Sequence, residues 1–451
     1  MTKQTRGLHV LGIESSCDDT GVAIVRQDGK ILSNCINSQL RQHITHGGII
    51  PMLAKEYHVD NIDNVAKQAF KESGLESVAQ DIDAIAVSTR PGLASSLQVG
   101  LNYARTLAKK YSKPLIPIHH MQAHALMPLL EHKTRIRFPL IALLISGGHG
   151  ILTIAERYNR FHVLGVTEDE APGDLLDKVA RRTRLRNLGE PFDRISGGAA
   201  IELLSQSAGS DSCKYFNDDR SVPMLLRRSC DLSFSGYRGT LETIYPKIDE
   251  LWATGKREEL LKELSDLSSS LQRGMLIQFC KKLQRAIHYY RSHWRFANED
   301  AFSRGNQSSH LGFDLCKADD GPDIVVSGGC AANRYFIEGL QRFCRHEVDE
   351  NTNVYSPSKG LCNDNGLMIA WNGMLRLQDF EENLKADGQL LEPTGGFCDS
   401  LDDSIIKDQS KMDEVEVKAD CAIGSDLRSD LISKSIELGK FQDPQLRLGR
   451  K

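Results

Sequence analysis

The chain has 451 residues, a hydrophobic fraction of 40% and a net charge of −4, the composition of an ordinary globular chain with room for two lobes. No apolar run approaches the roughly 20 residues that cross a bilayer, so an integral membrane protein is excluded. The 11 cysteines include no C-x-x-C pair, which favours reduced thiols over a disulfide framework or a zinc ribbon.

Two stretches of the chain share one pattern. Leu8–Asn37 and Leu140–Thr167 each open with an apolar run, break at a turn of small residues and continue into further β-rich residues. Helical periodicity lies between them, over Ile49–Ser73 and Leu97–Tyr111. The repeat, about 130 residues apart, predicts two related α/β lobes with a central cleft.

The remaining segments divide the chain further. Glu258–Tyr290 is the longest helical pattern and predicts a helix that packs in the core. Ser205–Arg220 and Arg291–Asp320 are polar and predict loops or insertions, whereas the residues from Asp399 onward predict a poorly ordered tail or a peripheral wrap. We therefore expect a candidate targeting remnant (1–7), an N-terminal lobe (8–125), a second lobe with insertions (126–354), a return to the first lobe (355–398) and a polar tail (399–451).

His120 and His124 follow the apolar strand Pro114–Ile118. A spacing of four places both imidazoles on one face of a helix, close enough to share a metal ion. A chance pair of histidines is the commoner explanation of such a spacing. The zinc-peptidase motif HExxH is excluded, because Met121 stands where that motif has its catalytic glutamate.

Glycine turns follow two of the predicted strands. Ser146-Gly147-Gly148-His149 ends the run that begins at Phe138, and Ser327-Gly328-Gly329 ends the run that begins at Pro322. Backbone N–H groups at such turns bind phosphate or ribose, because glycine lets a ligand approach the main chain. A third Ser-Gly-Gly, Ser196–Gly198, precedes a helical pattern. Three such turns favour nucleotide binding, although tight connections between elements explain each one singly.

Two acidic turns are candidates for chemistry. Asp364, in Cys362-Asn363-Asp364-Asn365-Gly366, either caps the following helix with Asn363 or supplies a carboxylate to a metal held by the two histidines. A His2Asp set leaves coordination positions open, as a catalytic metal requires. Glu14 and Asp18 lie in the turn of the first repeat, where they suit a substrate or cation contact or a solvated turn.

A run of cations follows the acidic residues Asp174 and Asp177. It comprises five side chains within nine residues: Lys178, Arg181, Arg182, Arg184 and Arg186. Such a run would attract a phosphate backbone. A solvated helix face is the simpler interpretation.

Together these segments resemble the tRNA N6-adenosine threonylcarbamoyltransferase family, formerly described as O-sialoglycoprotein endopeptidases. The resemblance runs in order from about Leu8 to Trp371, and HHMQAHAL is similar to the bacterial and mitochondrial branch. The segments that carry it are GIESSCDDTGVAI, HGGIIPMLAKEYH, RPGLASSLQVGLNYAR, HHMQAHAL, ISGGHGIL, GVTEDEAPGDLLDKVAR, LSFSGYRGT, VSGGCAANRYF and CNDNGLMIA.

The resemblance implies a two-lobed α/β fold of the acetate kinase, sugar kinase and actin (ASKHA) type. It implies transfer of a threonylcarbamoyl group from threonylcarbamoyl-AMP to N6 of the tRNA adenosine next to the anticodon (position 37), releasing AMP. It also implies a homodimer, a mitochondrial location and one divalent cation, with iron, zinc and manganese not distinguished. The cation ligands would be His120, His124 and Asp364.

The resemblance also implies a binding site for the adenylate. Ser146–Gly148 N–H groups would lie near the phosphate and Glu202 on the ribose hydroxyls, while Glu14 or Asp18 would orient or deprotonate N6. The full implied set is Ile145, Ser146, Gly147, Gly148, His149, Asp177, Gly198, Glu202, Ala332, Asn333 and Asn363.

Three other functions stay open at this point. A metalloprotease lacks the HExxH glutamate. A small-molecule kinase of the same fold has no use for the two histidines and Asp364. A tRNA-binding module without chemistry would have no reason to keep those three side chains.

Overall fold

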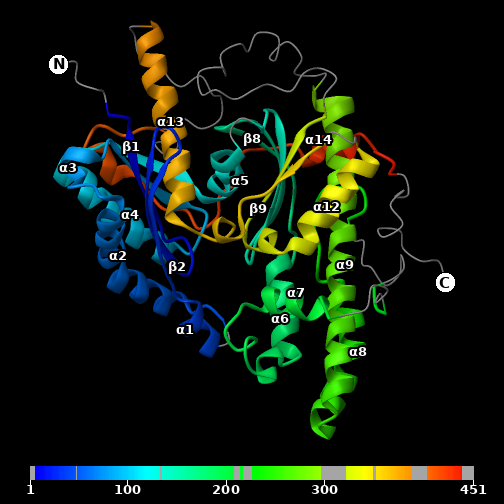
Figure 1. The fold of residues 1–451 in the computed structure, drawn as a ribbon. Helices are drawn as coiled ribbons and strands as arrows, with labels where there is room; N and C mark the ends of the chain where they lie inside the picture. The colour runs from blue at the N-terminus through cyan, green and yellow to red at the C-terminus, as the bar shows by residue number, and fades with distance from the viewer. Residues whose placement is uncertain are drawn as a thin grey trace.

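The computed structural model describes residues 6–46, 48–132, 135–207, 214–216, 226–295, 321–348, 352–387 and 404–438. Within these ranges the chain forms two mixed β-sheets with helices between and around them (Figure 1). No described helix is long and apolar enough to span a membrane. The eight cysteines in these ranges are unbridged, as the sequence predicts.

The N-terminal sheet has the strand order β3-β2-β1-β4-β5. The first three strands form an antiparallel meander, and β4 and β5 continue the sheet in parallel with β1. Gly29 allows the Asp-Gly turn between β2 and β3 with a φ of +88°. The strands are β1 (His9–Glu14), β2 (Asp19–Arg26), β3 (Ile31–Ser38), β4 (Ala84–Arg90) and β5 (Leu115–His119).

The second sheet repeats this arrangement with the order β10-β9-β6-β7-β8-β11. An antiparallel meander again lies on one side of its first strand, and two parallel strands lie on the other. The shared order confirms the predicted α/β class with two related lobes. The strands are β6 (Leu140–Ile145), β7 (Gly150–Arg157), β8 (Arg160–Val166), β9 (Asp323–Ser327), β10 (Val354–Tyr355) and β11 (Ser425–Asp426).

Helices cover both faces of the N-terminal sheet. On one face α2 and α4 pack against β2, β3 and β4, and on the other face α13 crosses β1, β2 and β4. Side chains in β1 alternate accordingly: Leu11 and Ile13 belong to the cluster under α2 and α4, and Val10 belongs to the cluster with α5 and α13. These helices are α1 (Leu40–Thr45), α2 (Pro51–Ser73), α3 (Val78–Asp81), α4 (Ala94–Tyr111), α5 (His120–His132) and α13 (Gly366–Asp387).

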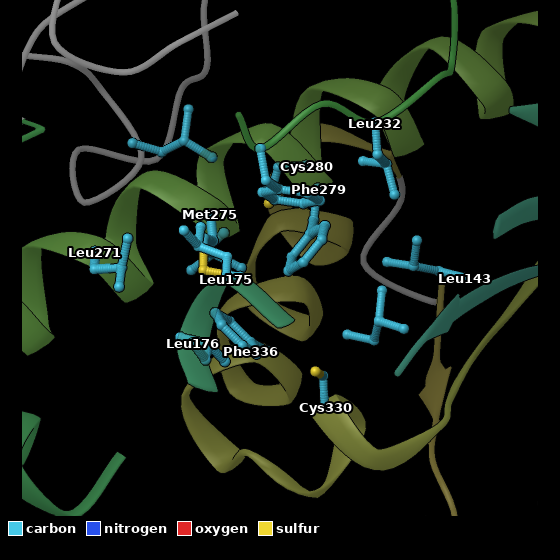
Figure 2. Close-up of a cluster of buried hydrophobic side chains, with 14 of the residues drawn as sticks. Leu143, Leu175, Leu176, Leu232, Leu271, Met275, Phe279, Cys280, Cys330 and Phe336 are labelled. Carbon is cyan, nitrogen blue, oxygen red and sulfur yellow. The ribbon is translucent and has the colours of Figure 1, made fainter. Parts of the chain in front are cut away.

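The second lobe is built around α9, which confirms the core helix predicted over Glu258–Tyr290. Figure 2 shows Leu271, Met275 and Phe279 of this helix among side chains of α6, α12 and β6 in one buried cluster. The helices of this lobe are α6 (Pro172–Arg182), α7 (Gly197–Ser205), α8 (Tyr237–Thr254), α9 (Arg257–Tyr289), α12 (Arg334–Glu347) and α14 (Arg428–Ser433), with short helical segments η1 (Leu185–Leu188), η2 (Tyr290–Trp294) and η4 (Gly329–Ala332). Two further short segments are η5 (Lys359–Leu361) and η7 (Lys411–Glu414), and Met412 of η7 packs in the N-terminal lobe.

The polar segments differ in part from their predicted structure. The stretch predicted as a loop from Arg291 begins instead as helix, because η2 continues α9 to Trp294, whose side chain is buried. Most of this stretch and of the 205–220 segment lies outside the described residues. From residue 404 the tail is a peripheral wrap: Ile406 bridges to Leu115 at β5, and β11 joins β8 of the other sheet. The division at residues 125, 354 and 398 stays a prediction.

Candidate functional site

Two glycines of the N-terminal sheet allow α13 to lie against its backbone. A Cβ on Gly21 would lie 2.5 Å from Gly366 N, and a Cβ on Gly12 would overlap Ala370 N and the Gly366 carbonyl oxygen. A side chain at either strand position is therefore sterically excluded, and only glycine permits this approach. As a result, the segment just before α13, which contains Asp364, lies beside the start of α5.

His120, His124 and Asp364 meet at this point. Their candidate ligand atoms all lie within 4.8 Å of one another. Asp364 Oδ1 is 3.0 Å from His124 Nε2 and 3.5 Å from His120 Nε2. The i,i+4 spacing therefore places both imidazoles on one face of α5, as predicted. Two imidazole nitrogens and a carboxylate oxygen are the ligands of a borderline divalent cation.

The cap of α13 bears on the two interpretations of Asp364. Asn365 Oδ1 accepts the backbone N–H of Met368 at 2.9 Å and so caps α13. Asp364 is left to face the histidines. The predicted cap therefore belongs to the next residue, and the metal-ligand interpretation of Asp364 gains support.

Glu14 lies behind His120. Its fully buried carboxylate places Oε2 3.1 Å from His120 Nδ1 and accepts the Ser16 N–H through Oε1 at 2.5 Å. Ser16 Oγ is also 3.1 Å from His120 Nδ1. A carboxylate on the second nitrogen of a ligating histidine fixes the ring and leaves Nε2 for the metal. Glu14 is thus placed to orient His120.

The charges of this group are mutually stabilising. Burial lowers the pKa of His120, but the Asp364 and Glu14 carboxylates outweigh it and raise the pKa to about 9. Burial raises the pKa of Asp364, but the positive charge of His120 and the hydrogen bond with His124 outweigh it and leave the pKa below its usual range. The group therefore favours positive charge between the imidazoles and the carboxylates.

The turn that contains Asp18 borders the same group. Burial raises the pKa of Asp18, and the Asp364 carboxylate adds to this. His58, on α2, fixes the turn: its Nδ1 lies 2.7 Å from Thr20 Oγ1, and its Nε2 lies 3.1 Å from the Cys17 carbonyl oxygen. Sequence patterns assign no role to His58 or Ser16, because each is one polar residue without a spacing partner.

The Ile145–His149 turn lies on the second lobe. Ser146 Oγ accepts the His149 N–H at 3.0 Å, and Ser146 N donates to the His149 carbonyl at 2.8 Å. The Ser146 N–H is thus used inside the turn, whereas the Gly147 and Gly148 N–H groups have no hydrogen-bond partner within it. Both are exposed, and a Cβ built on either meets nothing within 4 Å. Burial and the charge of His120 lower the pKa of His149 to about 4.

A second group of predicted residues joins α6, α7 and α12. Asp177 Oδ1 accepts the Gly198 N–H at 3.3 Å, and Glu202 Oε1 accepts the Arg334 N–H at 2.8 Å. Asn333 donates through Nδ2 to Gln272 Oε1 at 2.6 Å. Ala332 ends η4, and the turn before η4 lies against the Ile145–His149 turn. A Cβ on Gly328 would lie 2.5 Å from the Ile145 carbonyl oxygen. A Cβ on Gly329 would similarly lie 3.3 Å from Asn363 Oδ1.

The cationic run is largely paired. Lys178 contacts Glu170 and Asp174, and Arg182 and Arg184 both contact Asp249 on α8. These partners offset much of the local charge, which weakens the case for a phosphate-binding surface here. The third Ser-Gly-Gly serves as a helix cap, since Ser196 Oγ accepts the Ala199 N–H at 3.3 Å.

Comparison with known proteins places this geometry in context. A family model described as tRNA N6-adenosine threonylcarbamoyltransferase matches residues 30–371. The mitochondrial tRNA N6-adenosine threonylcarbamoyltransferase of Xenopus tropicalis is 38% identical over 409 residues, covering 90% of this chain and 92% of that protein. The human mitochondrial protein of the same name is 36% identical, with coverage of 82% and 81%.

A bacterial relative is almost as similar. The tRNA N6-adenosine threonylcarbamoyltransferase of Staphylococcus haemolyticus is 34% identical, covering 82% of this chain and 90% of that protein. Among solved structures, a ROK family glucokinase from Streptomyces griseus aligns at 12% identity with a TM-score of 0.43, covering 80% of this chain and 98% of that chain. The fold assignment rests on the strand order of the two sheets and not on that likeness.

Proposed function

The chain belongs to the tRNA N6-adenosine threonylcarbamoyltransferase family, and from that premise we propose how its residues carry out the reaction. The donor is threonylcarbamoyl-AMP. A bond forms between N6 of adenosine 37 and the carbamoyl carbon, the bond from that carbon to the phosphate oxygen breaks, AMP leaves with the electron pair, and N6 loses a proton. The leaving phosphate is already stable, so positioning and charge stabilisation suffice.

The observation that carries the proposal is the convergence of His120, His124 and Asp364 within 4.8 Å beside an exposed glycine turn. The ligand set fits a divalent cation, because two Nε2 atoms and one carboxylate oxygen face one another while Glu14 holds the far nitrogen of His120. A cation bound there would polarise the donor carbonyl. Iron, zinc and manganese all suit this set.

The side chains divide the remaining work. Gly147 and Gly148 N–H groups bind the adenylate phosphate, and the group made by Asp177, Gly198, Glu202, Ala332 and Asn333 binds its nucleoside. Of the two candidates for the N6 proton we favour Asp18, since Glu14 is fully buried and occupied by His120 and Ser16. Burial raises the pKa of Asp18, which makes its carboxylate a stronger base.

The transfer reaction can be tested directly. The purified protein is incubated with threonylcarbamoyl-AMP and unmodified tRNA, and the digested tRNA is searched for threonylcarbamoyladenosine by mass spectrometry. We expect product and one AMP released per modified adenosine. Binding of tRNA with no product and no AMP would overturn the transferase in favour of the binding module. Peptide cleavage that a chelator abolishes, or consumption of ATP with an acceptor, would favour the peptidase or the kinase.

Replacing Glu202 by glutamine tests the nucleoside site. Glutamine keeps an oxygen that accepts the Arg334 N–H but removes the negative charge of the oxygens that would accept hydrogen bonds from the ribose hydroxyls. A hydrogen bond to a charged group contributes about 1.5 kcal/mol or more. We expect the KM for threonylcarbamoyl-AMP to rise about tenfold with kcat little changed. Glu259→Gln, at an exposed position near the start of α9, is the matched control. An unchanged KM in Glu202→Gln would remove this residue from the site.

We infer that the protein is a homodimer that uses the face of α2. Met52 and Val59 are 61% and 55% exposed, and between α2 and α4 runs a groove of about 610 Å³ lined in part by Val59, Ile62 and Val99. Apolar residues that recur on one helix face mark a contact with another protein surface, and a second copy offers the same face to close a twofold interface.

Dimerisation is measured by light scattering during size exclusion. We expect the wild type to have twice the mass of one chain and Met52→Asp/Val59→Asp to have the mass of one chain, because burying two carboxylates costs several kcal/mol. Ile31→Asp, at another exposed apolar position, should remain dimeric. A double variant with the wild-type mass would place any interface elsewhere.

We also infer a mitochondrial location. Mitochondrial proteins from Xenopus tropicalis, Homo sapiens and Arabidopsis thaliana are 34–38% identical to the chain. Imaging of the full chain with a C-terminal fluorescent tag would test this, and exclusion of the tag from mitochondria would contradict it.

A further inference from the structure

The polar C-terminal segment contacts both lobes and passes beside the start of α5, where His120 lies. We call residues 404–438 the strap. In Figure 1 it is orange-red to red and lies near α3 and α4 on one side of the molecule and at α14 on the other. Isolated apolar residues anchor it to the N-terminal lobe: Ile406, Met412 and Val415 are buried in the cluster under α2 and α4. Arg105 of α4 donates to the Met412 and Val415 carbonyls at 2.8 and 2.7 Å.

The middle of the strap hydrogen-bonds to the backbone that follows β4, close to the residues around His120. Lys418 N donates to the Thr89 carbonyl and Gly92 N donates to the Ala419 carbonyl, both at 3.0 Å. Leu93, next to Gly92, donates to the Ser16 carbonyl at 2.8 Å. Since Ser16 Oγ contacts His120 Nδ1, the strap supports one of the two groups that orient this imidazole.

Two further contacts hold residues one position before and two positions after His120. His119 Nε2 lies 3.3 Å from the Cys421 carbonyl oxygen, and Gln122 Nε2 donates to the Ile423 carbonyl at 3.2 Å. Gln122 Oε1 in turn accepts from Arg376 of α13 at 2.9 Å. His119 and Gln122 thus hydrogen-bond to the strap, and Gln122 also hydrogen-bonds to the helix that follows Asp364.

Beyond residue 423 the strap is fixed to the second lobe. A Cβ on Gly424 would overlap the carbonyl group of Phe161, and β11 pairs in parallel with β8. Tyr289 of α9 donates to Asp430 Oδ2 at 2.5 Å. The crossing residues 418–424 are therefore held at both ends, so their position relative to α5 is determined by both lobes.

We propose that residues 418–424 of the strap are a positioning element for the metal site, which hold the first turn of α5 so that His120 meets Asp364. The proposal rests on the metal site of the proposed function but not on the transfer reaction. Disturbing a group that hydrogen-bonds to a metal ligand changes metal affinity about 10- to 100-fold, and the strap supports such a group in Ser16.

Gln122→Glu changes the contact of α5 with the strap, and Gly424→Ala changes the contact of the strap with β8. Glutamate keeps the acceptor for Arg376 but turns a second oxygen toward the Ile423 carbonyl. Alanine at 424 forces the strap away from β8. Co²⁺ is the probe, because its visible absorption reports both its affinity and its coordination geometry. We expect each variant to bind Co²⁺ at least about tenfold more weakly. The kcat for transfer should fall, while the KM for threonylcarbamoyl-AMP should change little.

Gly239→Ala is the control, since a Cβ at this position of α8 meets nothing within 4 Å. Wild-type Co²⁺ affinity and spectrum in both variants would overturn the proposal, and if Gly424→Ala does not fold, Gln122→Glu decides alone. Weaker Co²⁺ binding in the variants of a protein that makes no threonylcarbamoyladenosine would support the strap and overturn the transfer mechanism. A wild type that binds no Co²⁺ would overturn the metal site and the positioning role together.

Discussion

Replacing His120 and His124 together by alanine is expected to lower threonylcarbamoyl transfer by at least about a hundredfold, or ~2.7 kcal/mol of transition-state stabilisation. The change removes two of the three ligand atoms that lie within 4.8 Å. It also leaves the Glu14 and Asp364 carboxylates without the imidazoles that contact them. The rate is measured as threonylcarbamoyladenosine formed per enzyme by mass spectrometry, and bound metal by elemental analysis of the same sample.

His288→Ala is the matched control for the histidine pair. His288 is an exposed histidine on α9, so its removal should change neither metal content nor rate. A thermal unfolding curve shows whether the double variant is folded when it is assayed. A folded double variant that has lost its metal and still transfers at the wild-type rate would contradict a catalytic role for the cation. The family membership of the chain would stand in that case.

The second large effect concerns stability. Gly12→Ala is expected to reduce the free energy of unfolding by about 3 kcal/mol and to weaken metal binding as well. The new Cβ would overlap Ala370 N and the Gly366 carbonyl oxygen, which are main-chain atoms of α13. They cannot move away by a rotamer change, so the helix itself must shift. Asp364, two residues before that helix, would shift with it.

Denaturant unfolding followed by circular dichroism gives the free energy, and Co²⁺ titration gives the affinity. Gly239→Ala makes the same chemical change in open space on α8 and should leave stability unchanged or raise it by up to about 1 kcal/mol, because alanine favours a helix more than glycine does. Equal stability of Gly12→Ala and Gly239→Ala would show that α13 does not need its close contact with β1. Lost stability with unchanged Co²⁺ affinity would show that Asp364 is held by something other than the seating of this helix.

Patterns that depend on neighbouring residues can be predicted from the sequence. The strand repeat of Leu8–Asn37 and Leu140–Thr167 depends on alternation and turns, and both stretches form strands as predicted, three in each. The His120 and His124 spacing depends only on the helical period. The motifs from Leu8 to Trp371 indicate the family through their order alone, because each motif is weak but their succession along the chain is specific.

Contacts between distant residues cannot be predicted in this way. Asp364 and Asn365 are both reasonable helix caps by composition, and only the packing of α13 shows that Asn365 is the cap and that Asp364 meets a histidine 240 positions earlier. The cations Arg182 and Arg184 suggest a phosphate-binding surface when taken alone, but Asp249 of α8 contacts both of them. Charge in a sequence is local, whereas its neutralisation depends on the fold.

The strap separates the two kinds of information most clearly. Its polar composition allows either a poorly ordered tail or a wrap, because its buried residues, such as Ile406, Met412 and Ile423, are too far apart to give a period. Each is buried by a surface that other segments build, and its backbone hydrogen-bonds to those segments. By itself the sequence determined the duplicated α/β fold, the histidine pair and the family, since these follow from local periodicity and motif order. Only the tertiary structure decided how Glu14, Asp364 and the strap surround that pair, because those contacts join residues up to about 300 positions apart.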